Sequence, residues 1–117
     1  MDNITAFGKL ISDQTRLKII KLLSIRPLCV CEMMDILRLN QPCISQHLAI
    51  LKYHNLLKSR RDGKWIVYAV DKKVLGRYLN KISHFLEGSM SHVAELQKEH
   101  KRLKELKSRV VLCKKCR

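Results

Sequence analysis

The chain has 117 residues, enough to bury one hydrophobic core but not two. Hydrophobic residues make up 46% of it, which is ordinary for a globular protein, so disorder is not the default expectation. The net charge is +14, no apolar run approaches the roughly 20 residues of a membrane helix, and residues 1–13 do not have the character of a secretory signal. We therefore expect a cytoplasmic protein with no membrane partner.

The first part of the chain has the apolar spacing of short helices. Residues 3–10 can form one helix, and the next begins after two N-capping residues, Ser12 and Asp13. Pro27 ends that second helix. A shorter amphipathic helix follows over residues 30–39.

Residues 41–54 form the next predicted helix, which Asn40 caps and which tolerates Pro42 in its first turn. Its apolar side carries Ile44, Leu48 and Leu51, and its opposite side carries Ser45, Gln46, Ala49 and Tyr53. This opposite side has almost no charge, whereas a face that meets only water usually carries Lys and Glu. Small polar side chains suit base edges, so we predict that this is a recognition helix.

Residues 56–70 predict two strands around Asp62-Gly63, a dipeptide typical of a β-hairpin turn. The tip of this hairpin carries Arg60, Arg61 and Lys64 beside Trp65. Two short helices followed by a basic hairpin predict a winged helix-turn-helix, with the hairpin as the wing.

From about residue 72 the pattern is helical again, dips at Gly88 and resumes over residues 92–110. The apolar three-four spacing there predicts a long C-terminal helix that needs a partner. The expected fold class is therefore mainly α with a β-hairpin (α+β). We predict a winged helix-turn-helix domain with dimerisation helices over residues 1–88, and a basic helix with a cysteine-containing tail over residues 89–117.

The excess positive charge gathers in two blocks, residues 52–81 and 98–117. A cation-rich block attracts a polyanion, because neutralised phosphates release their counterions. A solvated helical face explains the second block well but the first one poorly, so we expect double-stranded DNA as the partner.

Five cysteines stand at positions 29, 31, 43, 113 and 116. An odd number without an export signal argues against a disulfide scaffold and favours thiolate ligands or redox thiols. Thiolates prefer soft ions such as As(III), Sb(III), Cd(II) and Pb(II). On a regular helix Cys29 and Cys31 would point 200° apart, so one ion can bridge them only where the backbone is not helical. Bridging would then strain the DNA-binding unit, and by linkage the ion would weaken DNA binding.

Three motifs together resemble the ArsR/SmtB family of metal-responsive repressors, and the resemblance covers roughly residues 5–88. They are D-x-T-R-L at 13–17, Q-P-x-I-S-x-H-L at 41–48 and R-x-G-x-W-x-x-Y at 61–68. The resemblance implies a homodimer built on the first and last helices that binds a twofold-symmetric operator. It also implies repression that a metal, a metalloid or a thiol-reactive signal relieves.

Among the sensor sites of this family, LCVCEMM at residues 28–34 resembles the arsenic-responsive type and matches it at Cys29 and Cys31. Met34 stands where that type has a third cysteine, so the third ligand stays open, with Cys113 or Cys116 as the options. We expect As(III) or Sb(III) as the inducer and no organic cofactor.

Other sensor types of the family fit less well. The cadmium/lead type adds N-terminal cysteines, and residues 1–28 contain none. The zinc type would use the positions of Asp71, Lys73, His84 and Glu87, where the ammonium of Lys73 repels a cation. A thiol redox or sulfide sensor on the same fold is the nearest alternative.

The residues expected to contact DNA lie on the recognition helix and the wing. We place Gln41, Ser45 and Gln46 near base edges with His47 at their flank, and Arg60, Arg61 and Lys64 near backbone phosphates or the minor groove. The chain has no Gly-rich phosphate loop, no paired carboxylates and no Ser/His/Asp order, so we expect a regulator and not an enzyme. A constitutive nucleoid-type DNA binder would explain the charge but not the cysteine pair.

Overall fold

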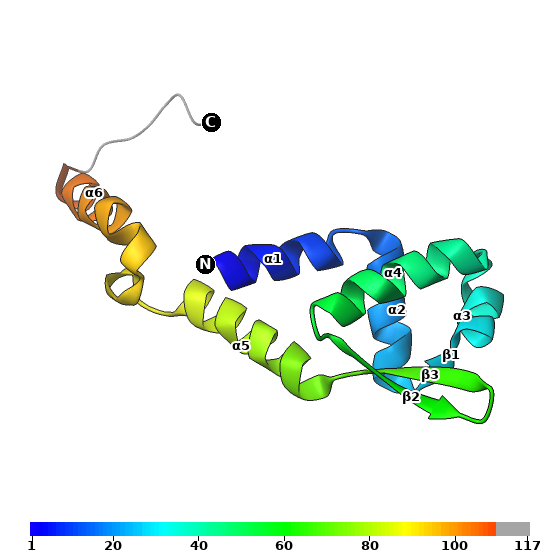
Figure 1. Ribbon diagram of the computed structural model, residues 1–117. Helices are drawn as coiled ribbons and strands as arrows, with labels where there is room; N and C mark the ends of the chain where they lie inside the picture. Colours follow the sequence, from blue (N-terminus) through cyan, green and yellow to red (C-terminus); the bar gives the residue numbers. More distant parts are fainter. Residues whose placement is uncertain (110–117) are drawn as a thin grey trace. The chain divides into compact units, whose positions relative to one another are not determined.

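A computed structural model describes residues 1–109 of the chain (Figure 1). The described residues divide into two compact units, the first of which is residues 1–81 and the second of which begins at residue 82. This division, between residues 81 and 82, lies within a helix and does not test the predicted domain boundary at residue 88. That boundary stays a prediction. Cys113 and Cys116 lie outside the described residues.

The four predicted N-terminal helices are all present, and all belong to the first unit. They are α1 (Asp2–Ile11), α2 (Gln14–Ile25), α3 (Val30–Leu37) and α4 (Gln41–Tyr53). A three-stranded antiparallel sheet accompanies them, with strand order β1-β3-β2. Its strands are β1 (Leu28–Cys29), β2 (Leu57–Asp62) and β3 (Trp65–Val70). The winged helix-turn-helix fold class is confirmed.

Side-chain caps explain where α2 and α4 begin. The Asp13 side chain accepts the backbone N–H of Arg16 at 3.0 Å, and the Asn40 side chain accepts that of Cys43 at 3.0 Å. Arg16 also donates from Nε to the carbonyl of Leu10 at 2.8 Å, which satisfies a free acceptor at the end of α1. The D-x-T-R motif therefore holds α1 and α2 together.

The hairpin turn differs by one residue from the prediction. Asp62 is the last residue of β2 and pairs with Trp65, so Gly63 and Lys64 make a two-residue turn. Gly63 has φ +62°, a left-handed conformation that glycine adopts without steric cost. The sequence analysis missed β1, because a strand of two residues is too short to show alternation.

The core of the first unit brings together apolar side chains from every one of its helices up to α4 and from all three strands. It consists of Phe7, Leu10, Ile19, Ile20, Leu23, Leu28, Met33, Ile44, Leu48, Leu51, Leu56, Leu57 and Val70. The predicted apolar side of the recognition helix is thus confirmed. Among the described residues no polar or charged side chain is fully buried.

The C-terminal part is not the single long helix that we predicted. Helix α5 (Lys72–Glu87) ends at Gly88, and two short 3-10 turns, η1 (Met90–His92) and η2 (Ala94–Leu96), separate it from α6 (Gln97–Arg109). A Cβ on Gly88 would lie 2.5 Å from the carbonyl oxygen of His84, so the close approach there requires glycine. The side-chain amide nitrogen of Gln97 lies within hydrogen-bond distance of three carbonyls of the turns, the nearest at 2.6 Å on Val93. No helix within the described residues is long and apolar enough to cross a membrane.

Candidate functional site

The outer side of α4 presents the three side chains predicted to lie near base edges, but not His47, which was predicted at their flank. Gln41, Ser45 and Gln46 are exposed. His47 is not with them: its side chain is 16% exposed and its Nε2 lies 4.0 Å from Oδ1 of Asp13. His47 therefore lies in the packing between α4 and the start of α2. Helical spacing contained this signal, because residue 47 is four positions before the buried Leu51.

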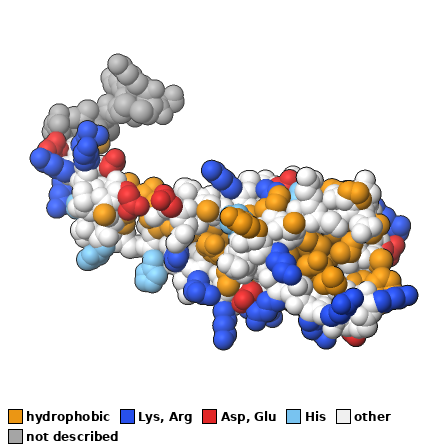
Figure 2. All heavy atoms as spheres, in the orientation of Figure 1, with side chains coloured by type: hydrophobic (Ala, Val, Ile, Leu, Met, Phe, Trp, Pro, Cys, Tyr) orange, Lys and Arg blue, Asp and Glu red, His pale blue; other side chains and the backbone are white. Residues whose placement is uncertain are grey.

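The wing carries basic side chains without acidic partners. Arg60, Arg61 and Lys64 are exposed, and none of the ion pairs among the described residues involves them. Figure 2 shows Lys and Arg side chains gathered over the hairpin. The ammonium of Lys64 lies 5.2 Å from the ring centroid of Trp65, a cation–π distance. This surface has the charge that is needed to bind a polyanion.

The two arginines of the wing point to opposite faces of the hairpin, because successive residues of a strand alternate. Arg61 pairs with Ile66, and Arg60 pairs with Val67. Directly opposed residues share a face, and Ile66 lines the groove beside α4 whereas Val67 and Arg60 line the other side. Arg61 is thus the arginine on the face that adjoins the recognition helix.

Cys29 and Cys31 occupy different backbone environments at the start of α3. Cys29 is the N-cap in an extended conformation (φ −91°, ψ 168°), and its backbone pairs with Val67. Cys31 lies inside the first turn of α3 and is exposed. The helix therefore begins between the two thiols, which is the non-helical start that a bridging ion requires.

Cys29 takes part in a capping box in which cysteine replaces the usual Ser or Thr. Its sulfur accepts the backbone N–H of Glu32, while its own N–H donates to Oε1 of Glu32 at 3.0 Å. The sulfur thus lies at the N-terminus of a helix, where the partial positive charge favours an anion.

The two thiols share one groove, of about 330 Å³, with the surfaces predicted to contact DNA. One wall comes from α3 and the residue before it, a second from α4 and a third from the wing. The lining residues are Cys29, Val30, Cys31, Met34, Gln41, Ser45, Lys64, Trp65, Ile66 and Tyr68. Apolar side chains are exposed between α4 and the hairpin in Figure 2. The sequence analysis did not foresee that Trp65, Ile66 and Tyr68 face the thiols.

The other candidate metal ligands are not brought together. Within residues 1–109 no group of three or more His, Cys, Asp or Glu side chains could hold a metal ion. Asp71, the first residue of the zinc-type set, caps α5 by accepting the backbone N–H of Lys73 at 3.1 Å. Cys43 is half-buried in the first turn of α4.

The two capping carboxylates allow a prediction about acid stability. The backbone N–H of Arg16 lowers the pKa of Asp13 below its ordinary 3.8, and the backbone N–H of Cys29, then its side chain, lowers the pKa of Glu32 below 4.5. A lowered folded-state pKa stabilises the fold above the unfolded-state pKa, and this contribution disappears as the pH falls through the folded-state value. We expect thermal stability to fall below about pH 4, and to fall less in Asp13→Asn, whose amide caps α2 but does not titrate. Melting temperatures measured across acidic pH test this, and an unchanged pH slope in the variant would contradict it.

Comparison with known proteins identifies relatives of this chain. The sequence profile described as "Bacterial regulatory protein, arsR family" matches residues 13–59. An arsenical resistance operon repressor of Escherichia coli is 43% identical over 67 residues, which are 56% of this chain and 57% of that protein. An uncharacterized HTH-type transcriptional regulator of Methanocaldococcus jannaschii is 46% identical over 71 residues, which are 59% of this chain and 75% of that protein. The match to the first relative thus spans less than two thirds of its length.

A solved structure covers more of the chain. An ArsR-like transcriptional regulator from a Rhodococcus species superposes with a TM-score of 0.69 and 19% identity, over 92% of each chain. At this identity the likeness shows the fold alone. The relatives are transcriptional regulators and not enzymes, as the sequence analysis predicted.

Proposed function

This chain belongs to the ArsR family of bacterial regulatory proteins, and from that premise we propose that it is a DNA-binding repressor released from its operator when As(III) or Sb(III) binds Cys29 and Cys31. The observation that carries the proposal is the groove in which these thiols lie beside Gln41, Ser45 and Lys64. A ligand held by the thiols is then in direct reach of the side chains that contact DNA. We place the protein in the cytoplasm, where reducing conditions keep thiols free to bind an ion.

The DNA part of the proposal rests on the adjacent exposed surfaces of α4 and the wing. The N-terminal residues of a recognition helix contact base edges in the major groove, and Gln41, Ser45 and Gln46 occupy these positions in α4. Arg61 and Lys64 can neutralise backbone phosphates. His47 is the weakest of the proposed DNA contacts, because its side chain is turned toward Asp13.

The sensing part rests on the backbone between the two thiols. When bound, a soft trivalent ion supplies strong bonds to thiolate sulfur. To share one ion, the Cys31 sulfur must approach that of Cys29, which pulls on the first turn of α3. The Cys29 sulfur would then exchange the N–H of Glu32 for the ion, so the capping box weakens. The third ligand of the ion would be Cys113, Cys116 or a small thiol from solution.

Because the thiols lie beside the proposed DNA contacts, ion binding and DNA binding would be thermodynamically linked, and the ion would release the DNA. An ion that binds the DNA-free form more tightly lowers DNA affinity by the same factor. Two effects would lower DNA affinity when the ion binds. A change in α3 would disturb α4, on which it packs, and the ion would occupy the groove between α4 and the wing.

We also propose a homodimer, as the family resemblance implies, with α1 and the C-terminal helices in the interface. The amphipathic helix α5 has no fully buried residue and exposes Leu79 and Leu86, which a second copy could cover. Sedimentation equilibrium at micromolar concentration should give twice the chain mass. A monomer that still binds palindromic DNA tightly would contradict the dimer.

One titration tests the proposed inducer against its alternatives. Labelled operator DNA, selected from random duplexes by the protein itself, is bound under reducing conditions and challenged with arsenite, antimonite, Cd(II), Pb(II) and Zn(II). We expect release by arsenite and antimonite at the lowest concentrations. Release by an oxidant or persulfide instead, reversed by a reductant, would identify a thiol redox sensor. No release by any of these agents would contradict regulated repression.

Substitutions on the wing and on the recognition helix should have different effects on DNA binding. We expect Arg61→Ala to weaken binding to all sequences and to reduce the slope of log K against log salt by about one, because one phosphate contact is lost. Gln46→Ala should instead reduce the preference for operator over random DNA by about 1–3 kcal/mol.

Arg60→Ala is the matched control for Arg61→Ala, because it removes the same charge from the other face of the hairpin. It should change the salt slope less. Equal effects of Arg60→Ala and Arg61→Ala, or equal effects of Gln46→Ala on operator and random DNA, would contradict this assignment of the surfaces.

A further inference from the structure

A second cavity, of about 300 Å³, lies at the C-terminal end of α4 and has no residue in common with the thiol groove. The first turn of α1, the two residues that follow α4, and one side of α5 form its walls, all within residues 1–81. The volume is at the lower end of the range for small-molecule pockets. The proposed DNA contacts and thiol sensing make no use of this cavity, although α1 and α5 also belong to the proposed dimer interface.

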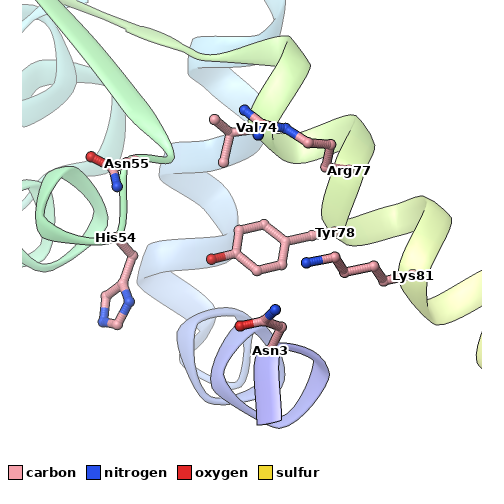
Figure 3. A pocket seen from close by; sticks show the side chains of 7 residues that line it. All are labelled: Asn3, His54, Asn55, Val74, Arg77, Tyr78 and Lys81. Atoms are coloured by element: carbon pink, nitrogen blue, oxygen red, sulfur yellow. The ribbon is translucent and has the colours of Figure 1, made fainter. Parts of the chain in front are cut away.

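An aromatic ring is part of the lining of the cavity. Figure 3 shows the Tyr78 side chain there, with its hydroxyl directed toward His54. The Tyr78 ring stacks on that of Phe7, with centroids 4.8 Å apart and planes inclined by 10°. Because Phe7 is part of the core, the stacking holds Tyr78 in place. Together with Val74, the ring gives the cavity a flat apolar surface.

The charged groups at the cavity are all cations. Arg77 and Lys81 lie four residues apart on α5, hence on one side of it, and Figure 3 shows the Lys81 ammonium beside the Tyr78 ring. No Asp or Glu lines the cavity, and within residues 1–109 no ion pair is recorded for either cation. Like charges at this spacing repel, so an anion between them would be favoured.

Further hydrogen-bond donors point to the same class of ligand. The side-chain amide of Asn3 and the imidazole of His54 line the cavity, and neither makes a hydrogen bond among the described residues. Donors and cations around an aromatic surface match an organic molecule that carries a carboxylate or a phosphate.

We propose that this cavity binds a small organic anion, with the anionic group at Arg77 and Lys81 and an apolar part against Tyr78 and Val74. The ligand would contact His54 and Asn55, which directly follow the recognition helix at the end opposite to the one that adjoins Cys29 and Cys31. The protein would thus carry a second effector site, independent of its thiols.

Calorimetric titration of the full chain with phenyl phosphate tests the proposal, because this probe combines an aromatic ring with an anion. We expect saturable binding, weaker binding of inorganic phosphate, and none of benzamidine, which has a similar ring with a positive charge. The double variant Arg77→Gln/Lys81→Gln should bind phenyl phosphate about tenfold more weakly or worse, since two charge-assisted hydrogen bonds are lost. Both side chains are exposed, so the fold should survive.

The matched control is Lys18→Gln/Lys21→Gln, which removes the same charge from exposed positions of α2 that do not line the cavity. It should leave phenyl phosphate binding unchanged. Absence of saturable binding, equal loss in both double variants, or equal affinity for inorganic phosphate would overturn the proposal. Binding to random duplex DNA tests the alternative that the two cations contact DNA and not a small anion. A salt slope reduced by about two in Arg77→Gln/Lys81→Gln would assign the two cations to DNA phosphates instead.

Discussion

Arsenite should fail to release the operator from the variants Cys29→Ser and Cys31→Ser at concentrations that release the unaltered chain. Each substitution leaves a single thiolate in the groove, and losing one of two linked attachment points weakens binding by about 10²–10⁴-fold. Serine keeps the size of the side chain but lacks the soft donor atom. The measurement is release of labelled operator DNA, with arsenite affinity measured in parallel on the DNA-free protein.

The fold should tolerate both serine substitutions. A hydroxyl at position 29 is a better N-cap than a thiol, and Glu32 is already placed to complete the capping box. Position 31 is exposed. DNA binding without arsenite should therefore stay close to that of the unaltered chain, so a lost response can be assigned to sensing.

Cys43→Ser is the matched control, because Cys43 is a free thiol on α4 outside the groove. It should respond to arsenite as the unaltered chain does. A retained response in the double variant Cys29→Ser/Cys31→Ser would show that the sensor is elsewhere. Replacing Cys113 and Cys116 together should lower arsenite affinity if the tail gives the third ligand, and should change nothing if a solution thiol gives it.

Leu51→Ala should destabilise the fold by about 2–5 kcal/mol, because it opens a cavity beneath the recognition helix. The Leu51 side chain is 0% exposed and packs in the core with Ile44 and Leu48. A loss of this size is a large part of the total stability of about 5–15 kcal/mol expected of a single domain. The urea midpoint should fall with an unchanged m-value.

Ile50→Ala is the control for Leu51→Ala, because it removes an aliphatic side chain from the next position of the same helix. Ile50 is 36% exposed, so its truncation should cost clearly less than that of Leu51. If the two variants lost equal stability, the inward orientation of Leu51 would be wrong.

Local signals in the sequence were enough to predict most elements of the first unit. The caps at Asp13 and Asn40 act within three residues, and the apolar side of α4 follows from helical spacing alone. Such interactions join near neighbours, so the residues that specify them are visible in a short stretch of sequence. The same reasoning failed at the C-terminal helix, where the break depends on the tight contact of Gly88 with His84 and on the contacts of Gln97 with the turns.

The sequence by itself was enough to predict the fold class, helix α4, the hairpin and the pair of thiols at positions 29 and 31. The tertiary structure decided which of these residues meet. Pairing of Cys29 with Val67 brings the thiols to the hairpin, and the packing of α3 on α4 adds Gln41 and Ser45 to the same groove. The cavity at Arg77 and Tyr78 likewise needs three helices to come together. These contacts join residues far apart in the chain, so they depend on the packing of the whole core, which no local pattern encodes.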